Sequence, residues 1–251
     1  MIYYFSATGN NKYVAERVAE AVGTQAVSIQ ERIDSAQIDV DAGEQGVVGF
    51  VSPTYACGLP EIFKRFFRKV SLGGGGRPYV FFAATYGTTP GFTGQAAKRM
   101  LAERGIAVSA FYSIRMPDNW TVAFDLSDAE KVAETNRRAD EEISVMLERI
   151  RKRRSGNFMR RTLPYFAAPL ALRSYEKMRR TSFFSVDENC AGCGLCEKKC
   201  PDRAIAMRDG KPCWVKEQCI MCLGCLHRCP KFSIQYGNRT REHGQYRHPK
   251  S

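Results

Sequence analysis

Near its C-terminal end the sequence reads CAGCGLCEKKCP over residues 190–201 and CIMCLGCLHRCP over residues 219–230. Each stretch separates four cysteines by two, two and three residues and ends in proline. In this spacing three thiols hold one 4Fe-4S cluster on a tight loop, and the fourth serves the other cluster. The first cluster is assigned Cys190, Cys193, Cys196 and Cys229, and the second Cys219, Cys222, Cys225 and Cys200. The spacing therefore predicts two clusters with crossed ligation.

Zinc and disulfides are the alternatives for so many cysteines. Zinc also binds Cys-x-x-Cys pairs, but its sites usually join two separate knuckles and need no third close cysteine. A disulfide framework belongs to exported proteins, and no signal-peptide cleavage site follows the first apolar residues. The longest apolar stretch, residues 163–172, is far shorter than the roughly 20 residues of a membrane span. We therefore expect a cytoplasmic protein.

Over residues 182–237 the sequence resembles the bacterial-type ferredoxins that carry two 4Fe-4S clusters, through eight of its ten cysteines. The resemblance implies a small α+β domain with two short hairpins, whose clusters lie close enough to exchange electrons. Cys213 and Cys57 fall outside the pattern. We expect Cys213 to be a packed apolar residue. Cys57 has no basic neighbour in sequence that would lower its thiol pKa, so we expect it to fill space in its loop.

The first 154 residues alternate between strand-like and helical segments, which is typical of an α/β fold. Five apolar runs predict strands, at residues 2–5, 26–29, 47–51, 79–84 and 107–114. A capping-box pattern from Ser127 to Glu130 predicts the start of the last helix, which ends at the basic run 151–154. One face of that helix carries the apolar residues Ala129, Val132, Ala139, Ile143, Leu147 and Ile150.

Three loops follow predicted strands, at the edge where open parallel sheets bind ligands. SATGNN at residues 6–11 offers hydroxyls and backbone amides at a helix start, which favours an anion. SPTYACGLP at residues 52–60 and TYGTTPG at residues 85–91 each place a tyrosine beside flexible backbone. Singly, such residues are common in turns and caps. Together they suit a flat ring tethered to one phosphate, as in FMN, whereas no Gly-x-Gly-x-x-Gly motif supports NAD.

Through these loops the N-terminal part resembles a flavodoxin. The resemblance implies a doubly wound, five-stranded parallel sheet in the order 2-1-3-4-5 and one FMN. The implied phosphate contacts are Ser6, Thr8, Gly9, Asn10 and Asn11. The implied ring contacts are Pro53, Thr54, Tyr55, Gly58, Thr85, Tyr86 and Gly87. Asn11 departs from the threonine that flavodoxins usually have there, and its amide can donate in place of the hydroxyl.

Residues 155–182 are a predicted connector between the domain at 1–154 and the ferredoxin-like domain at 183–237. Residues 151–182 carry 10 basic and one acidic side chain, and so supply most of the net charge of +12. The connector also contains the apolar residues Phe158, Leu163, Tyr165, Phe166 and Leu170. Three interpretations stay open: a strap packed on both domains with its cations in water, a docking site for an acidic redox protein, and contact with an anionic membrane surface.

No known nucleic-acid-binding module surrounds the basic residues, so we expect no nucleic acid partner. The tail at 238–251 is polar, and we expect it to be disordered or to be an end without effect on expression. We do not expect its two histidines, His243 and His248, to bind metal.

Taken together, the two parts resemble flavodoxin-ferredoxin fusions of the EFR1 type, a resemblance that covers nearly the whole chain and implies electron transfer. A cluster passes one electron at a time and a flavin holds one or two, so their union links one-electron carriers to two-electron chemistry. No side chain is expected to act as acid or base. Two alternatives stay open: a flavin-dependent reductase of a small organic or quinone acceptor fed through the clusters, and a non-enzymatic redox or iron-sulfur sensor. Air-sensitive clusters suggest an anaerobic host.

Overall fold

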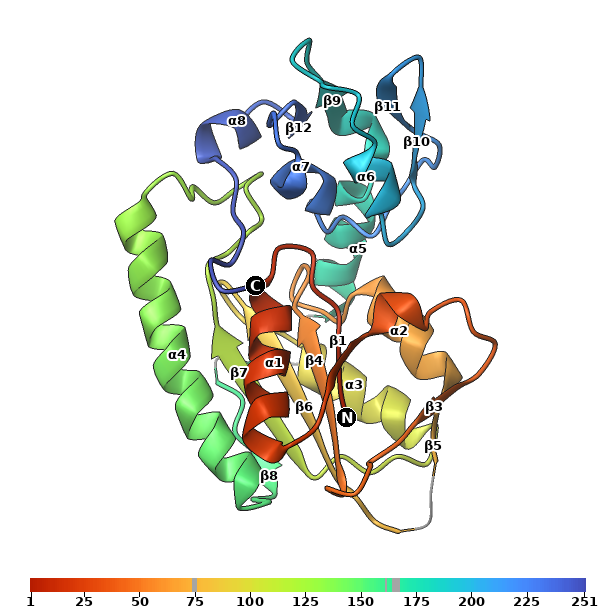
Figure 1. Cartoon of the computed structure of the whole chain (residues 1–251), viewed down its shortest axis with the longest axis vertical. Helices are drawn as coiled ribbons and strands as arrows, with labels where there is room; N and C mark the ends of the chain where they lie inside the picture. Colours follow the sequence, from red (N-terminus) through yellow and green to blue (C-terminus); the bar gives the residue numbers. More distant parts are fainter. Residues whose placement is uncertain (74–75, 161, 164–167) are drawn as a thin grey trace.

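Two stacked domains make up the protein, which we describe from a computed structural model. The structure describes residues 1–73, 76–160, 162–163 and 168–251, without the side chains at 168, 171, 172 and 174. An α/β domain contains the N-terminus, and a smaller domain with the cysteine stretches lies over one end of it (Figure 1). Among the described residues, no helix combines the length and the apolar character that crossing a bilayer requires.

The α/β domain is built on a fully parallel sheet. In spatial order its strands are β2 (Ala26–Ser28), β1 (Ile2–Tyr4), β4 (Val47–Pro53), β6 (Tyr79–Tyr86), β7 (Ala110–Arg115) and β8 (Gly156–Asn157). The first five are the predicted strands in the predicted order 2-1-3-4-5, which is the order of the flavodoxin-like doubly wound fold. The predicted count of five is wrong, because β8 adds a sixth strand at the edge. β8 is exposed and has two residues without an apolar pattern, so only backbone pairing with β7 reveals it.

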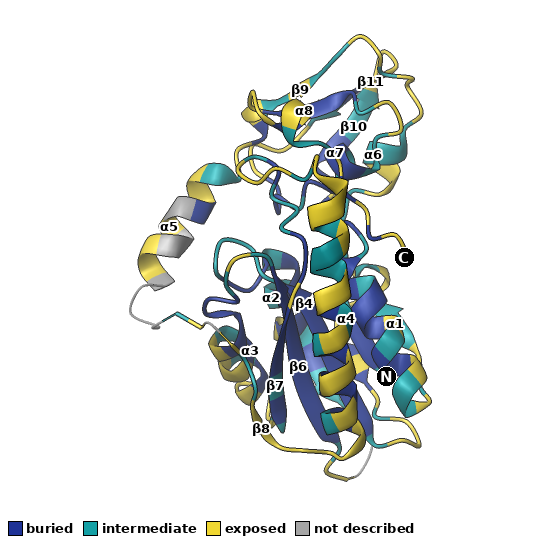
Figure 2. Ribbon diagram, turned by 90° about the vertical axis from the view of Figure 1, so that its left-hand side faces the viewer, coloured by how far each residue is buried: buried dark blue, intermediate teal, exposed yellow. Residues whose placement is uncertain are grey.

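Helices cover both faces of this sheet (Figure 1). α1 (Asn10–Val22) and α4 (Ala129–Arg151) pack on one face, and α2 (Glu61–Lys69) and α3 (Thr93–Ala102) on the other. The central strands β4 and β6 are buried throughout, as strands covered on both faces must be (Figure 2). A separate parallel pair, β3 (Ile38–Val40) with β5 (Val70–Leu72), adds Ile38, Val40 and Val70 to the core under α2.

The start of α4 differs from the prediction by one residue. Its N-cap is Asp128, whose Oδ1 accepts a hydrogen bond from the backbone N–H of Lys131 at 3.0 Å. Ser127 instead donates its own N–H to Asp125 Oδ1 at 2.8 Å, so it lies in a turn that precedes the helix. Of the predicted apolar stripe, the buried members are Ala139, Ile143, Leu147 and Ile150. Ala129, in the first turn, is exposed.

The smaller domain is α+β, as predicted. Its antiparallel pairs are β9 (Phe184–Val186) with β12 (Ile234–Tyr236) and β10 (Ile205–Arg208) with β11 (Lys211–Trp214). Two short helices, α6 (Leu195–Lys198) and α7 (Gly224–Arg228), each lie within one cysteine stretch. The rings of Phe184 and Trp214 stack with centroids 4.5 Å apart and join the two strand pairs.

The described part of the connector contacts both domains. Phe158 stacks on Tyr112 of β7 with ring centroids 5.3 Å apart. In α5 (Ala168–Met178), the buried Tyr175 donates its hydroxyl to the carbonyl of Ile220 at 2.6 Å. These contacts support the strap interpretation, but Leu170 is 76% exposed and does not pack as a strap residue should. Tyr165 and Phe166 lie outside the described residues.

The tail is ordered, so the prediction of disorder is wrong. After α8 (Thr240–His243) the chain returns to the α/β domain and ends beside the start of α1 (Figure 1). Tyr246 and His248 are buried there. The polar sequence hid this because the tail is held mainly by hydrogen bonds and two rings, without an apolar run.

Candidate functional site

A cavity of about 320 Å³ lies at the carboxyl ends of β1, β4, β6 and β7, under the smaller domain. Its volume falls within the range of small-molecule sites. Ten of the predicted flavin contacts line it: Ser6, Thr8, Asn10, Asn11, Pro53, Thr54, Tyr55, Thr85, Tyr86 and Gly87. The other two predicted contacts, Gly9 and Gly58, do not line the cavity and instead shape its loops.

The phosphate loop, residues 6–11, turns sharply into α1. Gly9 has a φ of 102°, in the left-handed region that favours glycine, and its N–H donates to Ser6 Oγ at 3.0 Å. No side chain caps α1 through Gly9. The first N–H groups of that helix are therefore available to an anion in the cavity.

Asn10 and Asn11 are buried beside the cavity, but their side chains have different surroundings. Asn11 Oδ1 accepts from Thr85 Oγ1 at 2.8 Å, which joins the first and third loops. This bond uses the amide oxygen, so the amide nitrogen is the group left to donate in place of the usual threonine hydroxyl. Asn10 Oδ1 accepts from Tyr246 Oη at 2.7 Å, and its Nδ2 donates to Pro117 O at 3.4 Å. Asn10 is thus better placed to serve a phosphate through its backbone than through its side chain.

The second loop is a tight turn between Tyr55 and Gly58. Two backbone hydrogen bonds of 3.0 and 2.9 Å join these residues. Between them Ala56 and Cys57 have φ values of 45° and 64°, which are unfavourable for residues with a Cβ and are typical of strained functional loops. Burial raises the pKa of the Cys57 thiol, and the nearby negative charge of Asp118 raises it further. This cysteine is therefore not an activated nucleophile.

A fourth loop, residues 116–120 after β7, also lines the cavity, and the sequence interpretation missed it. Asp118 accepts from Thr88 Oγ1 and from the N–H of Trp120, both at 3.2 Å, and burial raises the pKa of its carboxyl. A Cβ at Gly87 would lie 2.1 Å from Asp118 Oδ2, so glycine is required there. Asp118 and Trp120 lie in the loop after the fifth predicted strand. Since open parallel sheets bind ligands beyond the carboxyl ends of their strands, the same criterion that selected the other three loops also selects this one.

The smaller domain and the connector close the cavity from the other side. Tyr175 and Met178 of α5 line it, together with three consecutive residues of the second cysteine stretch, Met221, Cys222 and Leu223. Cys222 Sγ and Ala7 Cβ both lie within 4 Å of the position that a Cβ would take at Gly224. A predicted cluster ligand therefore forms part of the wall of the predicted flavin site.

The eight cysteines of the pattern surround two further hollows. One is lined by Cys190, Cys193, Cys196 and Cys229, and the other by Cys200, Cys219, Cys222 and Cys225. These are the two sets that the spacing predicts. Among the described residues, no three His, Cys, Asp or Glu side chains converge closely enough to hold a single metal ion, so the thiols of each set surround a space and not one point.

The surroundings of the thiols suit a cluster bound by thiolates. Burial raises the pKa of Cys219 to about 11 and that of Cys222 to about 12, so iron binding must displace their protons. Backbone N–H groups donate to three of the sulfurs, each at 3.3 Å: Ala204 to Cys200, Met221 to Cys219 and Ser233 to Cys229. Such hydrogen bonds tune the potential of a cluster.

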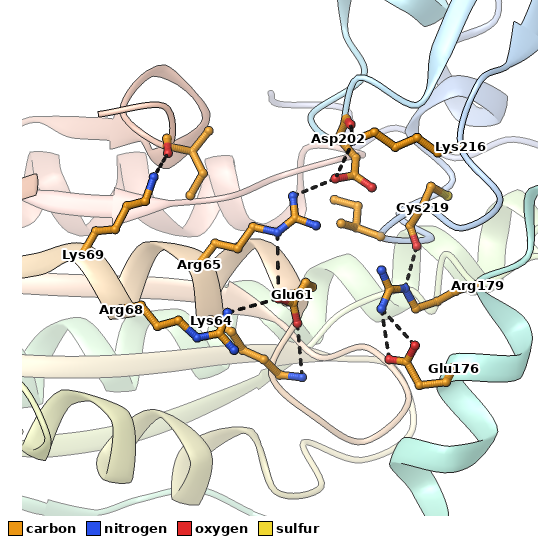
Figure 3. Close-up of polar contacts among 12 residues, drawn as sticks. Glu61, Lys64, Arg65, Arg68, Lys69, Glu176, Arg179, Asp202, Lys216 and Cys219 are labelled. Carbon is orange, nitrogen blue, oxygen red and sulfur yellow. Dashed lines mark hydrogen bonds and ion pairs between the residues drawn. The ribbon is translucent and has the colours of Figure 1, made fainter. Parts of the chain in front are cut away.

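Polar contacts between the domains lie next to these ligands (Figure 3). Arg65 of α2 pairs with Asp202, two residues beyond Cys200, at 2.7 Å. Arg179, beyond the end of α5, donates to the carbonyl of Cys219 at 2.8 Å and is paired with Glu176. The first contact holds the second cysteine set against the α/β domain, and the second holds it against the connector.

Comparison with known proteins gives one sequence match: residues 189–234 match the family model of the 4Fe-4S dicluster domain. No curated protein sequence matches the chain. Solved structures similar to it include a flavodoxin from Megasphaera elsdenii, with 18% identity over 56% of this chain and 97% of its own and a TM-score of 0.33. A WrbA-like flavodoxin from Agrobacterium tumefaciens has 17% identity over 57% of this chain and 95% of its own, with a TM-score of 0.31. An azoreductase from Bacillus anthracis has 10% identity over 59% of this chain and 100% of its own, with a TM-score of 0.35.

Strand order and register define the flavodoxin-like topology of the α/β domain independently of these similarities. The narrower resemblance to EFR1-type fusions stays a prediction. The chain joins an α/β domain of flavodoxin-like topology to a region that matches the 4Fe-4S dicluster domain.

Proposed function

We propose that this protein transfers single electrons between two 4Fe-4S clusters, held by the eight cysteines, and one FMN in the cavity between the domains. The observation that carries the proposal is the position of Cys222, which belongs to one cysteine set and also lines the cavity. In this arrangement Cys222 lies between the second cluster and the flavin, so the path for an electron between them is short. FMN supplies the ability to hold one or two electrons, while a cluster passes one at a time.

The chain's own residues hold and enclose the flavin in this proposal. The N–H groups at the start of α1, with Ser6 and Thr8, bind the phosphate. Tyr55 and Tyr86 flank the ring from the second and third loops. Burial raises the pKa of the Tyr55 phenol, which therefore stays protonated beside an anionic cluster. Tyr175 and Met178 limit the access of water.

The position of the two cysteine sets gives the clusters an order. The set with Cys222 is proximal to the flavin, and the set with Cys193 is distal. Cys193 is exposed, whereas Cys219 in the proximal set is buried. External electrons therefore enter or leave at the distal cluster.

The rim of the distal cluster fits an acidic redox protein. Lys231 lines the hollow of this cluster, and four further exposed cations lie within three residues of lining residues in sequence: Lys198, Lys199, Arg208 and Lys211. The turn between Arg208 and Lys211 reaches the cysteine loop, because a Cβ at Gly192 would lie 2.9 Å from the Gly210 carbonyl oxygen. Within the described part of the chain none of the five forms an ion pair, and the acidic residues directly next to them in sequence are Glu197 and Asp209. The surplus of positive charge steers an acidic partner toward Cys193.

Anaerobic protein tests the proposal directly. By the ligand count we expect about eight irons and one flavin per chain. After rapid mixing with less than one equivalent of reduced acidic ferredoxin, the clusters should be reduced before the flavin. Cys196→Ala should remove the distal cluster and slow flavin reduction, and Cys213→Ala, outside both sets, should leave the rate unchanged.

Two results would reject electron transfer through the clusters. One is a protein that binds no FMN. The other is a Cys196→Ala variant that lacks four irons but reduces its flavin at the normal rate. Steady turnover of a quinone at the flavin, without any protein partner, would favour the reductase alternative.

A further inference from the structure

The phosphate loop at 6–11 is held from outside by residues far away in the sequence. The first holding element is α7, which contains Cys225 in its first turn and ends directly before Cys229. These two cysteines belong to different sets, so each end of α7 carries a ligand of a different proposed cluster. The second is the tail segment 246–248, which contacts Thr8 and Asn10 of the loop.

Two side chains of α7 connect it to the flavin site. Arg228 Nη2 donates to the carbonyl of Ser6 at 3.0 Å. His227 Nδ1 accepts the N–H of Tyr246 at 3.1 Å, so its proton is on Nε2 and is donated to the carbonyl of Asn119 at 2.8 Å. Asn119 in turn donates its Nδ2 to Thr8 Oγ1. The helix therefore holds the phosphate loop directly and also through the fourth loop.

The tail completes the contact. Tyr246 Oη donates to Asn10 Oδ1 at 2.7 Å, and the N–H of His248 donates to the carbonyl of Thr8 at 2.8 Å. A Cβ at Gly9 would lie 1.9 Å from Ser251 Oγ, so the tail packs directly on the backbone of the loop. The position of the tail depends on α7, because Tyr246 is anchored to His227.

α7 depends on its surroundings for this position, because a helix of five residues is unstable alone in water. Leu226 packs in the core of the smaller domain, and Cys225 and Cys229 tie the helix to iron at both ends once clusters are bound. Without clusters the helix keeps only the first of these supports. The Arg228 and His227 contacts to the loop then weaken, and a phosphate must order the loop more fully as it binds.

On the basis of the proposed function, we propose that cluster insertion tightens flavin binding through α7, with Arg228, His227 and Tyr246 as positioning residues. Coupling between two sites is reciprocal. Bound FMN therefore also slows the loss of iron. FMN therefore binds with its full affinity only after both clusters have been inserted.

The first measurement is the dissociation constant of FMN, from quenching of flavin fluorescence in anaerobic full-length protein. It is compared between the cluster-loaded protein and the same protein after anaerobic chelation of iron. We expect binding to weaken on the order of 5- to 150-fold on iron removal, the usual range of site coupling. FMN should slow iron release to a chelator by a similar factor.

The second measurement uses cluster-loaded variants and does not depend on iron-free protein staying folded. Arg228→Met should weaken FMN binding about fivefold or more with full iron content, and Arg228→Lys should restore most of the affinity. Tyr246→Phe should weaken it through the tail. Arg239→Met is the control, because Arg239 is an exposed cation at the start of the tail, and among the described residues its side chain makes none of these contacts.

Equal FMN affinity in iron-loaded and iron-free protein would overturn the coupling and leave electron transfer intact. Unchanged affinity in the loaded Arg228→Met and Tyr246→Phe variants would overturn the route through α7 and the tail. A protein that binds no FMN in either state would instead reject the proposed function itself.

Discussion

Arg65 Nη1 in α2 lies 2.7 Å from Asp202 Oδ1 in the cysteine-containing domain, and the side chain of Asp202 is only 3% exposed. Removing one partner of a buried ion pair lowers the free energy of unfolding by more than the intact pair contributes, because the remaining charge is left buried and unpaired. Lys216, 3.7 Å from the same oxygen, compensates in part. The pair therefore helps to hold the two domains in register.

We expect Arg65→Ala to lower the free energy of unfolding by about 1–3 kcal/mol, because it leaves a charged hydrogen-bonding group unsatisfied. The measurement is urea unfolding under anaerobic conditions, followed by cluster absorbance and by circular dichroism. Arg68→Ala is the matched control, since Arg68 lies on the same helix, is 60% exposed and pairs only within α2. Equal unfolding midpoints for both variants would contradict this role.

Arg228 also places a positive charge near the proximal cluster, since its guanidinium lies close to Gly224 and Cys222. Removing a cation makes an anionic cluster harder to reduce. For a unit charge about 10 Å from a one-electron centre at an effective dielectric constant of about 20, the shift is about 70 mV. Arg228→Met should therefore lower the potential of the proximal cluster by tens of millivolts in an EPR-monitored titration. An equal shift in Arg239→Met, or none in either variant, would remove Arg228 as the cause.

Docking of the tail should weaken in acid. Burial lowers the pKa of His248 to about 4, although Asp140 acts in the opposite direction, while its ring stacks on Tyr13. Between pH 6.5 and about 4 the released tail binds a proton that the docked tail does not, so docking is strongest above pH 6.5 and is lost as pH falls through this window. Hydrogen-exchange protection of the amides at Tyr246 and His248, corrected for intrinsic rates, should fall from pH 7.5 to pH 5. In His248→Phe, which keeps a stacking ring without the titration, this fall should be smaller; an equal fall in the variant would assign it to another group.

The basic rim predicts salt-dependent docking at the distal cluster. The double variant Arg208→Glu and Lys211→Glu should slow association with an acidic ferredoxin about tenfold or more at low ionic strength, and the difference should shrink at high salt. Reduction by a small neutral reductant should not change. A double reversal on the α/β domain, Lys12→Glu and Lys98→Glu, is the control for net charge. The same slowing in that control would show that no specific surface is involved.

The sequence predicts those features that depend on local patterns. The cysteine spacing gives both ligand sets because each loop encodes its own geometry. Apolar runs give the first five strands of the sheet, most clearly β4 and β6, which are buried on both faces. β8 was missed because two exposed residues, Gly156 and Asn157, pair through backbone alone. Asp128 replaced Ser127 as the helix cap because adjacent capping residues compete and the choice depends on how the helix packs.

The flavin site was predicted only in part, for a related reason. Ser6, Tyr55 and Thr85 follow strands and can be found along the chain. Cys222 and Tyr246 reach the same region from distant parts of the sequence, and no local pattern carries that information. Contacts of this kind appear only when the domains are placed together.

The tail that packs on Gly9 has a consequence for biosynthesis. Along the chain the phosphate loop precedes every cysteine of the pattern, whereas Tyr246 and His248 follow all of them. Until the tail has been synthesised, the phosphate loop of the proposed flavin site lacks its contacts with Tyr246 and His248. Under the proposed function, firm retention of FMN therefore follows synthesis of both cysteine stretches and of the tail, which favours loading of iron before FMN.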